Sequence, residues 1–405
     1  MDPKLNPYTP NAGAAPEVLI GRDDQLESFE TLLARLARGR TEQSMIITGL
    51  RGVGKTVLLN KFEHLATDAN WEVVSFEASK GDDEEFRRKM FTQLKGALLR
   101  LSPRARWDSF ARDAAAALSS FALVIDHDAR LTASWGVDPS EGVADHGDIG
   151  LDLTDTLVAV GKAAQARKRG VAILIDEVQF LQPAQLEALI QSVHRTVQLK
   201  LPVTFVGAGL PQIAELAGDA KSYAERLFKF PVIGELSYEE AIRALRDPAA
   251  AEGVEFETDA AELAVDFTRG YPYFIQELGY QAWIIAEGPT ITARDVEEAR
   301  EAYEEKLDSS FFRVRLDRAT PLQAAYMRAM AELGPAPQKA ADVAKLLQRD
   351  SSQLGPARAQ LIEMGLLYTP AHGYAAFTVP DFDRFMLRAM PELEIPNIAR
   401  RKRRG

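Results

Sequence analysis

The sequence contains no cysteine, which excludes disulfide bonds, metal sites built from thiolates and a cysteine nucleophile. It also lacks any apolar run approaching the roughly 20 residues that are needed to cross a bilayer. The first ten residues include three prolines, and no apolar signal-peptide core follows them. We therefore expect a protein of the cytoplasm that begins with a flexible arm at residues 1–16.

An excess of basic residues is also missing. The net charge of -11 argues against a surface that binds nucleic acid in general. Residues 321–405 differ from the rest, with 12 basic and 8 acidic residues, and five of the basic ones form a tail at Arg400, Arg401, Lys402, Arg403 and Arg404. With 405 residues, 46% of them hydrophobic, the chain is long enough for two or three globular domains.

A complete phosphate-binding pattern lies at residues 49–56, GLRGVGKT, between an apolar run typical of a buried strand and the start of a helix. Its glycines let backbone amides surround a polyphosphate, and the helix N-terminus favours negative charge. Lys55 is expected to bridge the terminal phosphates and Thr56 to hold Mg²⁺. The alternative, a glycine-rich turn without a ligand, lacks this strand and helix context. ATP or ADP with Mg²⁺ is the expected ligand.

Asp176 and Glu177 end a second diagnostic stretch, in which five apolar residues at 171–175 predict a buried parallel strand. Further strands are predicted at 71–76, 203–206 and 228–233, with helices between them. This alternation predicts an α/β fold, a parallel sheet with helices on both faces, whose ligands bind outside the carboxyl ends of the strands. We expect Asp176 to bind the metal ion and Glu177 to polarise the attacking water.

The pattern of elements changes after residue 235. Capping and periodicity predict helices at about 237–251, 259–269, 272–286 and 293–306, a small helical domain. Helices at 321–333, 339–348 and 352–364 and a hairpin around His372 are the elements of a winged helix-turn-helix. The predicted domains are the core at 17–235 with an insertion at about 119–150, a helical domain at 236–310, a winged helix at 320–390 and a basic tail at 391–405.

From residue 18 to 390 the chain resembles the AAA+ and STAND ATPases, particularly the branch related to origin-recognition proteins. The resemblance rests on Ile20-Gly21-Arg22, GLRGVGKT, ILIDE, Arg226 in its AERLF context, Gly270-Tyr271-Pro272 and the C-terminal winged helix. It implies that the helical domain is a lid over the nucleotide and that residues 18–22 lie against the adenine. The nucleotide contacts expected from the motif and the resemblance are Gly49, Leu50, Arg51, Gly52, Val53, Gly54, Lys55, Thr56, Val57, Ile20, Arg22 and Pro272.

Arg226 occupies the place where AAA+ proteins carry an arginine finger, which enters a neighbouring subunit's site. The alternative is a surface ion pair, for example with Glu225. The expected catalytic residues are therefore Glu177, Lys55 and Arg226, and the expected metal ligands are Thr56 and Asp176. Two features depart from the AAA+ pattern: strand 203–206 leads into Gly207-Ala208-Gly209 instead of a polar sensor, and Gly270-Tyr271-Pro272 lacks the usual lid arginine. Both favour slow hydrolysis and switching.

Two functions remain open. In the first, an ATPase couples nucleotide state to assembly and engages DNA through the winged helix and the basic tail. In the second, a STAND-like switch uses the winged helix to contact protein. Helix 352–364 favours this function over DNA binding, because few of its side chains are long, polar and suited to reading bases; it offers Arg358 and Gln360, and it also carries Glu363. A pseudoenzyme is disfavoured by intact Lys55 and Glu177. In the insertion, Asp126-His127-Asp128 and Asp145-His146-x-Asp148 are expected to be solvated acids, with a cation site as the alternative.

Overall fold

The computed structural model describes residues 1–11, 13–103, 107–124 and 136–396. It divides into two compact units. The core unit comprises Ile20–Gly49 and Gly54–Gly234, and the lid unit comprises Met1–Leu19, Leu50–Val53 and Glu235–Gly405. The helical lid and the C-terminal domain, which the sequence suggests are separate, lie in one unit. That unit also takes in the tip of the phosphate loop, a segment surrounded in sequence by the core.

A five-stranded parallel sheet in the order β2-β3-β4-β1-β5 forms the centre of the core unit, which confirms the predicted α/β fold. The strands are β1 (Ser44–Thr48), β2 (Glu72–Glu77), β3 (Val171–Asp176), β4 (Val203–Gly209) and β5 (Phe228–Lys229). The central strands β1 and β4 are buried at every position because helices cover both faces. The fifth strand, β5, is much shorter than the predicted strand at 228–233. In the described chain, the rest of that stretch pairs with the sheet only through one β-bridge between Val232 and Thr48.

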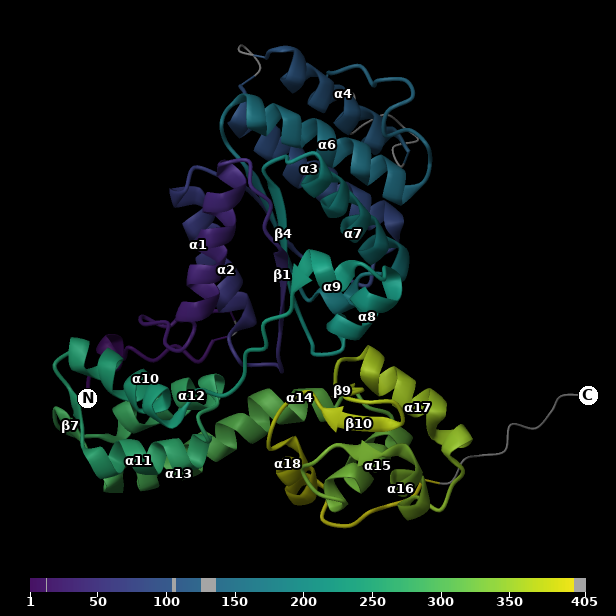
Figure 1. The fold of residues 1–405 in the computed structure, drawn as a ribbon. Coiled ribbons are helices and arrows are strands. Elements are labelled where there is room, and N and C mark those ends of the chain that lie inside the picture. Colours follow the sequence, from purple (N-terminus) through teal and green to yellow (C-terminus); the bar gives the residue numbers. More distant parts are fainter. Residues whose placement is uncertain (12, 104–106, 125–135, 397–405) are drawn as a thin grey trace, which may run out of the picture. The chain divides into compact units, whose positions relative to one another are not determined.

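The helices of the core unit lie on opposite faces of the sheet, with α1 and α2 on one side and α3, α6 and α7 on the other (Figure 1). Their bounds are α1 (Asp23–Ala37), α2 (Lys55–Asp68), α3 (Asp83–Leu101), α4 (Ser109–Leu123), α6 (Ile149–Ala166), α7 (Pro183–Gln198), α8 (Ile213–Ala220) and α9 (Ala224–Leu227). The apolar run at 121–125, placed in the insertion, begins as the last turn of α4, where Phe121 and Ala122 are buried against the core. Asp148 caps α6, so this helix begins inside the stretch at about 119–150 that the sequence predicts to be an insertion.

The lid helices follow the predicted pattern closely. They are α10 (Tyr238–Ala251), α11 (Thr258–Thr268), α12 (Pro272–Ile285) and α13 (Ala293–Lys306). The capping box of Ser237 and Glu240 opens α10 as expected, whereas Glu257 rather than Asp259 lies at the N-cap of α11. Two-residue strands β6 (Glu255–Phe256) and β7 (Thr290–Ile291), too short to predict, pair beside these helices. A π-helical segment, η4 (Leu307–Phe312), and α14 (Arg313–Leu316) lead onward.

The C-terminal domain, residues 320–396, contains the expected three helices and hairpin. These are α15 (Pro321–Glu332), α16 (Ala340–Leu346), α17 (Ser351–Glu363), β9 (Leu367–Tyr368) and β10 (Tyr374–Phe377), followed by α18 (Phe382–Ala389). The hairpin strands pair antiparallel, and an additional strand β8 (Gln338–Lys339) joins β10 on its other side. The rings of Phe312 and Phe385 stack 5.3 Å apart and so join η4 to α18 within the lid unit.

The N-terminal arm is not loose, contrary to its composition. Tyr8 is buried in the lid unit, where its hydroxyl donates to the carbonyl oxygen of Leu245 and its ring meets Phe256 edge-on. Trp283 Nε1 donates to the carbonyl oxygen of Asp2 at 3.0 Å, and Asn6 Nδ2 donates to that of Tyr280 at 3.2 Å. The arm contains one short 3-10 helix, η1 (Pro3–Leu5), and hydrogen bonds with α12 hold it in place.

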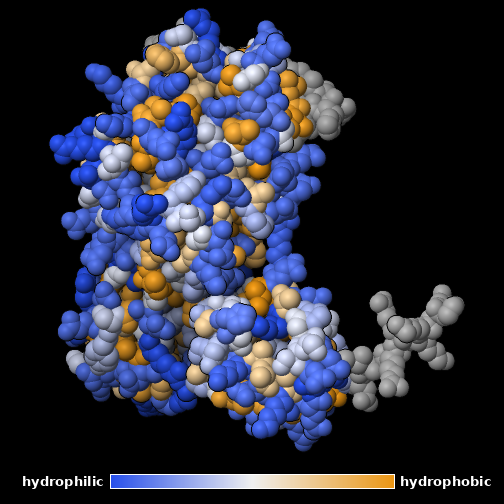
Figure 2. All heavy atoms as spheres, turned by 45° about the vertical axis from the view of Figure 1, so that its right-hand side comes forward, coloured by the Kyte–Doolittle hydropathy of each residue, from blue (hydrophilic) through white to orange (hydrophobic). Residues whose placement is uncertain are grey.

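The surface in Figure 2 is mainly hydrophilic, and its apolar residues form small separate groups between charged ones. In the described parts of the chain, none of the helices combines the length and apolar character that a membrane span requires.

Candidate functional site

The phosphate loop connects β1 to α2 through two glycines with left-handed backbone. Gly52 and Gly54 have φ angles of +87° and +92°, which are strained for any residue with a Cβ atom. The helix begins at Lys55, whose side chain is 6% exposed and whose Nζ donates to the carbonyl oxygen of Gly49 at 3.0 Å. This places the lysine ammonium inside the turn of the loop, as the motif predicts.

Thr56 and Asp176 meet at the carboxyl edge of the sheet. The Thr56 hydroxyl donates to Asp176 Oδ2 at 2.5 Å, although 120 residues separate them in sequence. Burial raises the pKa of Asp176, and the hydrogen bond from Thr56 opposes that rise. Hydroxyl and carboxylate oxygens are the ligands that Mg²⁺ prefers. These two side chains therefore fit a magnesium ion, as expected for the pair.

Glu177 follows in an unusual backbone conformation. Its φ of +52° lies in the left-handed region, which is uncommon for a residue other than glycine, and its backbone N–H donates to Asp176 Oδ1 at 2.8 Å. Gln179 Nε2 donates to Glu177 Oε2. The sequence analysis missed this glutamine. The glycines at 207 and 209 could have indicated it, because the absence of side chains at these positions leaves space that a side chain of another segment can fill.

Ile20 and Arg22, expected near the adenine, lie in the core unit at its N-terminal edge. Ile20 is buried. The Arg22 guanidinium is also buried and donates to the carbonyl oxygens of Gly21 at 2.7 Å and Gly234 at 2.9 Å. Arg22 thus ties the start of the core unit to its last residue. Val57, in the first turn of α2, is half-buried.

The tip of the phosphate loop is held by residues of the lid unit. The Arg51 N–H donates to the carbonyl oxygen of Thr378 at 3.0 Å, and the Tyr271 hydroxyl donates to the carbonyl oxygen of Arg51. The Tyr273 N–H donates to the carbonyl oxygen of Gly52 at 3.2 Å. Leu50–Val53 therefore belong by their contacts to the lid unit. Neither motif spacing nor periodicity predicts these hydrogen bonds, whose partners are more than 200 residues apart.

Pro272 is the first residue of α12, where its missing N–H costs no helix hydrogen bond. It lies between the two tyrosines that hold the loop tip. A Cβ at residue 52 would approach Tyr271 Cε1 at 3.1 Å and Tyr273 Cβ at 3.2 Å. Close packing, in addition to the left-handed φ, therefore requires glycine at position 52.

Two arginines bring positive charge close to this tip. Burial and then the charge of Arg51 lower the pKa of Arg315 to about 10, so that Arg315 remains cationic at neutral pH. Arg315 lies 4.1 Å from the ring centroid of Phe311, which stacks on Tyr273. Among the described residues, neither guanidinium forms an ion pair with an acid, and Arg51 Nε is buried without a partner. The tip is therefore electrostatically suited to an anion.

Arg226 lies on the short helix α9, beside β5. Its side chain is exposed, and in the described part of the chain it forms no ion pair with Glu225 or another acid. Its backbone carbonyl accepts a hydrogen bond from Gln43 Nε2 at 3.0 Å. The expected alternative of an intramolecular ion pair is thus not seen, and the guanidinium remains accessible to another molecule.

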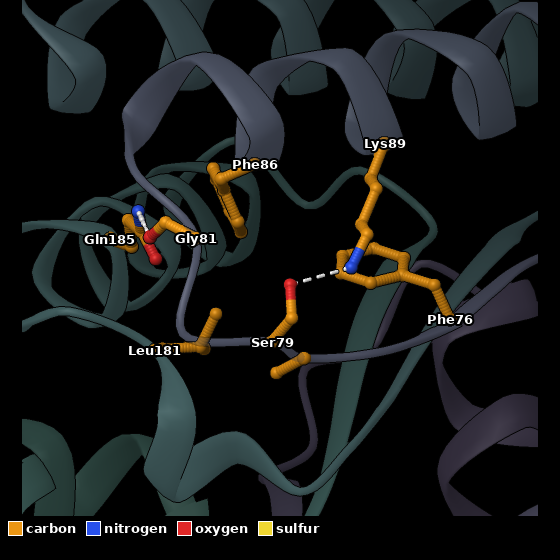
Figure 3. A pocket seen from close by; sticks show the side chains of 8 residues that line it. Phe76, Ser79, Gly81, Phe86, Lys89, Leu181 and Gln185 are labelled. Atoms are coloured by element: carbon orange, nitrogen blue, oxygen red, sulfur yellow. Dashed lines mark hydrogen bonds between the residues drawn. The ribbon is translucent and has the colours of Figure 1, made fainter.

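A small cavity lies beyond the carboxyl end of β2 (Figure 3). Its lining includes Phe76, Ser79, Lys89 and Leu181, and the Lys89 ammonium donates to Ser79 Oγ at 2.8 Å. The cavity volume is about 10 Å³, which is the size of one water molecule. It has no space for a nucleotide.

The acidic loop before α6 has a structural role in the described chain. Asp148 caps the helix, and His146 Nε2 lies 3.1 Å from Asp155 Oδ2, a contact that raises the pKa of the histidine. No group of three metal-ligating side chains is present among the residues described here. Asp126-His127-Asp128 lies outside the described residues.

In the C-terminal domain, the residues expected to read DNA are engaged elsewhere. Arg358 Nη2 donates to the carbonyl oxygen of Tyr374 at 2.6 Å and to Thr369 Oγ1 at 3.3 Å. Gln360 Oε1 accepts a hydrogen bond from Gln323 Nε2 at 2.8 Å. Arg358 thus joins α17 to the hairpin, and the basic residues at 400–404 lie outside the described part of the chain.

Comparison with protein families gives two matches. Residues 18–206 match the AAA ATPase domain, and residues 309–386 match a domain of unknown function (DUF8462). No curated protein is close enough in sequence to match.

Solved structures are similar over almost the whole chain. A Walker-type ATPase of Pyrococcus abyssi has a TM-score of 0.55 at 13% identity, covering 92% of this chain and 97% of that one. Cdc6p of Pyrobaculum aerophilum has a TM-score of 0.46 at 15% identity. The RuvB Holliday junction branch migration motor of Thermotoga maritima has a TM-score of 0.47 at 15% identity. Each of these two alignments covers 97% of this chain and 99% of the other chain. Residues 18–206 are thus similar to AAA ATPase domains, and together with the phosphate loop and acid pair they support a nucleotide-dependent P-loop ATPase.

Proposed function

We propose that this protein is an ATP-hydrolysing switch, in which the bound nucleotide controls how the lid and the C-terminal domain hold the phosphate loop. The bound nucleotide would thereby determine whether copies of the protein assemble and whether the C-terminal domain, which we interpret as a winged helix, can bind a partner. The observation that carries the proposal is the set of hydrogen bonds from Tyr271 and Tyr273 to the loop tip, and from Arg51 to Thr378. A loop that closes around phosphate must rearrange these contacts.

The chemistry is assigned to residues of the core unit. Lys55 neutralises charge on the terminal phosphates, and backbone amides at the start of α2 bind them. Thr56 and Asp176 would hold Mg²⁺, which supplies charge neutralisation for the phosphates when bound. Glu177 orients the attacking water and accepts its proton. Arg226 is proposed to reach the site of a neighbouring subunit, because its guanidinium is exposed and forms no ion pair in the described chain.

The like charges of Arg51 and Arg315 support a switch at the loop tip. Their mutual repulsion is not offset by an acid among the described residues. An anion bound at the loop would lower that repulsion, so nucleotide charge and the contacts of the tip are expected to be coupled.

The output of the switch is proposed to be contact with a protein. The exposed residues of α17 include no basic side chain, because Arg358 is turned into the hairpin. These exposed residues are Ser351, Ser352, Gln353, Gly355, Pro356, Ala359, Gln360 and Glu363. A major-groove helix usually presents bidentate basic or amide side chains to bases. Engagement of DNA remains the alternative, and it would depend on the basic residues of the tail.

Nucleotide binding and hydrolysis are tested first. Lys55→Ala should abolish ATP binding, because the phosphates would lose their main counter-charge. Glu177→Gln should bind ATP but hydrolyse it about 10²- to 10⁴-fold more slowly, since this is the contribution of a general base. Equal ATP affinity of Lys55→Ala and the wild type, measured by titration of labelled nucleotide, would reject the assignment.

The hold on the loop tip is tested with Tyr271→Phe, which removes one hydroxyl. Because the loop must give up this hydrogen bond to close around phosphate, its loss should slow ADP release roughly 2- to 10-fold, since such a bond contributes about 0.5–1.5 kcal/mol. Tyr326→Phe is the matched control, because that hydroxyl is buried in the same unit without a partner. If both variants release ADP at the wild-type rate, the loop tip does not regulate the site.

Particle mass with ADP and with ATP, each with and without duplex DNA, distinguishes the outputs. The protein-partnered switch predicts no DNA complex even at low salt. DNA binding through the tail predicts a complex whose affinity falls by orders of magnitude between low and moderate salt. A DNA complex that survives deletion of residues 400–405 and is weakened by Arg358→Ala would favour recognition by α17 instead.

A further inference from the structure

The side chain of Gln179 joins the ends of two neighbouring strands at the candidate catalytic edge. Gln179 lies in a short 3-10 helix, η3 (Val178–Phe180), that follows β3. Its Nε2 donates to Glu177 Oε2, and its Oε1 accepts from the Leu210 N–H at 3.1 Å, directly after β4. The two ends of the amide cannot be exchanged, because a carboxylate only accepts and a backbone N–H only donates. Gln179 therefore fixes Glu177 with respect to the end of β4.

Glycine at the end of β4 leaves the space that this amide occupies. A Cβ at residue 209 would lie 2.7 Å from Gln179 Oε1 and 3.0 Å from Val178 Cγ2, which is closer than such atoms normally approach. At residue 207 a Cβ would lie 3.1 Å from Val178 Cγ1. The strand lacks a polar side chain here because residues of η3 fill its place.

The same connection reaches the phosphate loop through the backbone. The carbonyl oxygen of Gly209 accepts a hydrogen bond from the Gly49 N–H at 3.2 Å. A continuous series of contacts within the core unit thus runs from Glu177 through Gln179 and residues 209–210 to the first glycine of the loop. The left-handed backbone at Glu177 gives its side chain a direction that Gln179 then secures.

We propose that Gln179 is a positioning residue for ATP hydrolysis, acting through Glu177 in place of the polar side chain expected at the end of β4. The inference rests on the proposed function. In that reaction the water oxygen bonds to the terminal phosphorus as the phosphorus bond to the ADP oxygen breaks, and Glu177 accepts the proton of the water. Gln179 donates to Oε2, which leaves Oε1 to accept the proton of the water. A misplaced base costs rate rather than nucleotide affinity.

Gln179→Met tests this directly, because methionine has a similar length but forms neither hydrogen bond. The expected result is a kcat that falls roughly 10- to 100-fold with an ATP dissociation constant within about 2-fold of wild type. Gln179→Asn, which keeps the amide but is too short to span both partners, should also be slow. Loss of ATP affinity in parallel with kcat in both variants would indicate a structural role and overturn the proposal.

Gly209→Ala provides an independent variant that leaves the glutamine in place. Its added methyl group would displace the Gln179 amide and should reproduce the loss of kcat at unchanged ATP affinity. Gly218→Ala is the matched control in the same unit, because no heavy atom outside its own helix lies within 4 Å of its Cβ position. Wild-type kcat in Gly209→Ala and Gln179→Met would overturn the inference.

The double variant Gln179→Met with Glu177→Gln separates action through Glu177 from a general defect. If Gln179 acts through Glu177, the double variant hydrolyses ATP as slowly as Glu177→Gln alone, whereas additive losses would overturn the inference. A different result would contradict the proposed function itself. If the wild type hydrolyses ATP no faster than Glu177→Gln, Glu177 is not the catalytic base, and the role proposed for Gln179 is then rejected as well.

Discussion

At the scale of residues, the core unit contains a buried ion pair that no motif identifies. Arg87 Nη2 lies 2.8 Å from Asp152 Oδ2, with the two side chains 3% and 0% exposed, and the guanidinium lies over the ring of Phe121. Asp152 Oδ1 also accepts from the His146 N–H at 2.8 Å. The pair thus joins α3, α4 and α6 to the loop that precedes α6.

Removing one partner of this pair should be costly. Arg87→Met leaves the Asp152 carboxylate buried without its counter-charge and is expected to lower the free energy of unfolding by about 3–5 kcal/mol. Adding Asp152→Asn removes the stranded charge and keeps the acceptor for His146, so the double variant should be more stable than Arg87→Met alone. Denaturant unfolding measures both. Glu84→Gln, in the exposed pair with Arg88, is the control and should cost less than about 1 kcal/mol.

Glu277 gives a pH-dependent prediction in the lid. Burial raises its pKa, and Lys306 and a hydrogen bond from Gln281 offset this only in part. Because the folded state holds the proton more tightly than the unfolded state, stability falls as pH rises from the ordinary glutamate pKa to the raised one. Glu277→Gln should therefore raise the free energy of unfolding at pH 8 more than at pH 4, which thermal unfolding at the two pH values measures. Equal gains at both pH values would contradict the prediction.

At the scale of elements, the N-terminal arm behaves as part of the lid. Tyr8 contacts Phe256 and α12, and a Cβ at residue 279 would lie 2.7 Å from its ring. Tyr8→Ala should cost about 3–5 kcal/mol, as for other buried aromatic side chains. Gly279→Ala should displace the arm from α12 without changing the sequence of the arm itself. Gly288→Ala is the control, because no heavy atom lies within 4 Å of a Cβ at that position. Protease cleavage within residues 1–16 measures release; equal cleavage of all variants would reject the docking of the arm.

The sequence predicted those elements whose signals are local. Five apolar residues before Asp176 suffice for a buried strand, and the phosphate loop is recognised by its spacing. The docking of Tyr8 could not be predicted, because its acceptor lies 237 residues away. Arg358 appeared available because its partner, a backbone carbonyl of the hairpin, has no sequence signature. Gln179 was missed because the polar residue was sought on β4 but comes from the turn after β3.

At the scale of the whole molecule, the role proposed for Arg226 requires assembly of several copies. Arg226→Ala should lose hydrolysis while keeping ATP affinity. The Lys55→Ala variant cannot bind ATP but has an intact Arg226. When the two variants are mixed, some activity should return, because some assemblies will place a subunit with an intact Lys55 next to a subunit with an intact Arg226. ATP hydrolysis over a series of mixing ratios measures this. Absence of rescue, with assembly confirmed by particle mass, would favour a site completed within one chain.

The docking of the arm also has a consequence for synthesis. The carbonyl of Leu245 and the helix α12, which bury Tyr8, are made more than 230 residues after it. At about 5–20 residues per second, the tyrosine and its apolar neighbours wait roughly 10–50 seconds for their partner. During that interval Tyr8 lacks the partners that bury it, and a chaperone that binds short apolar segments has access to the arm.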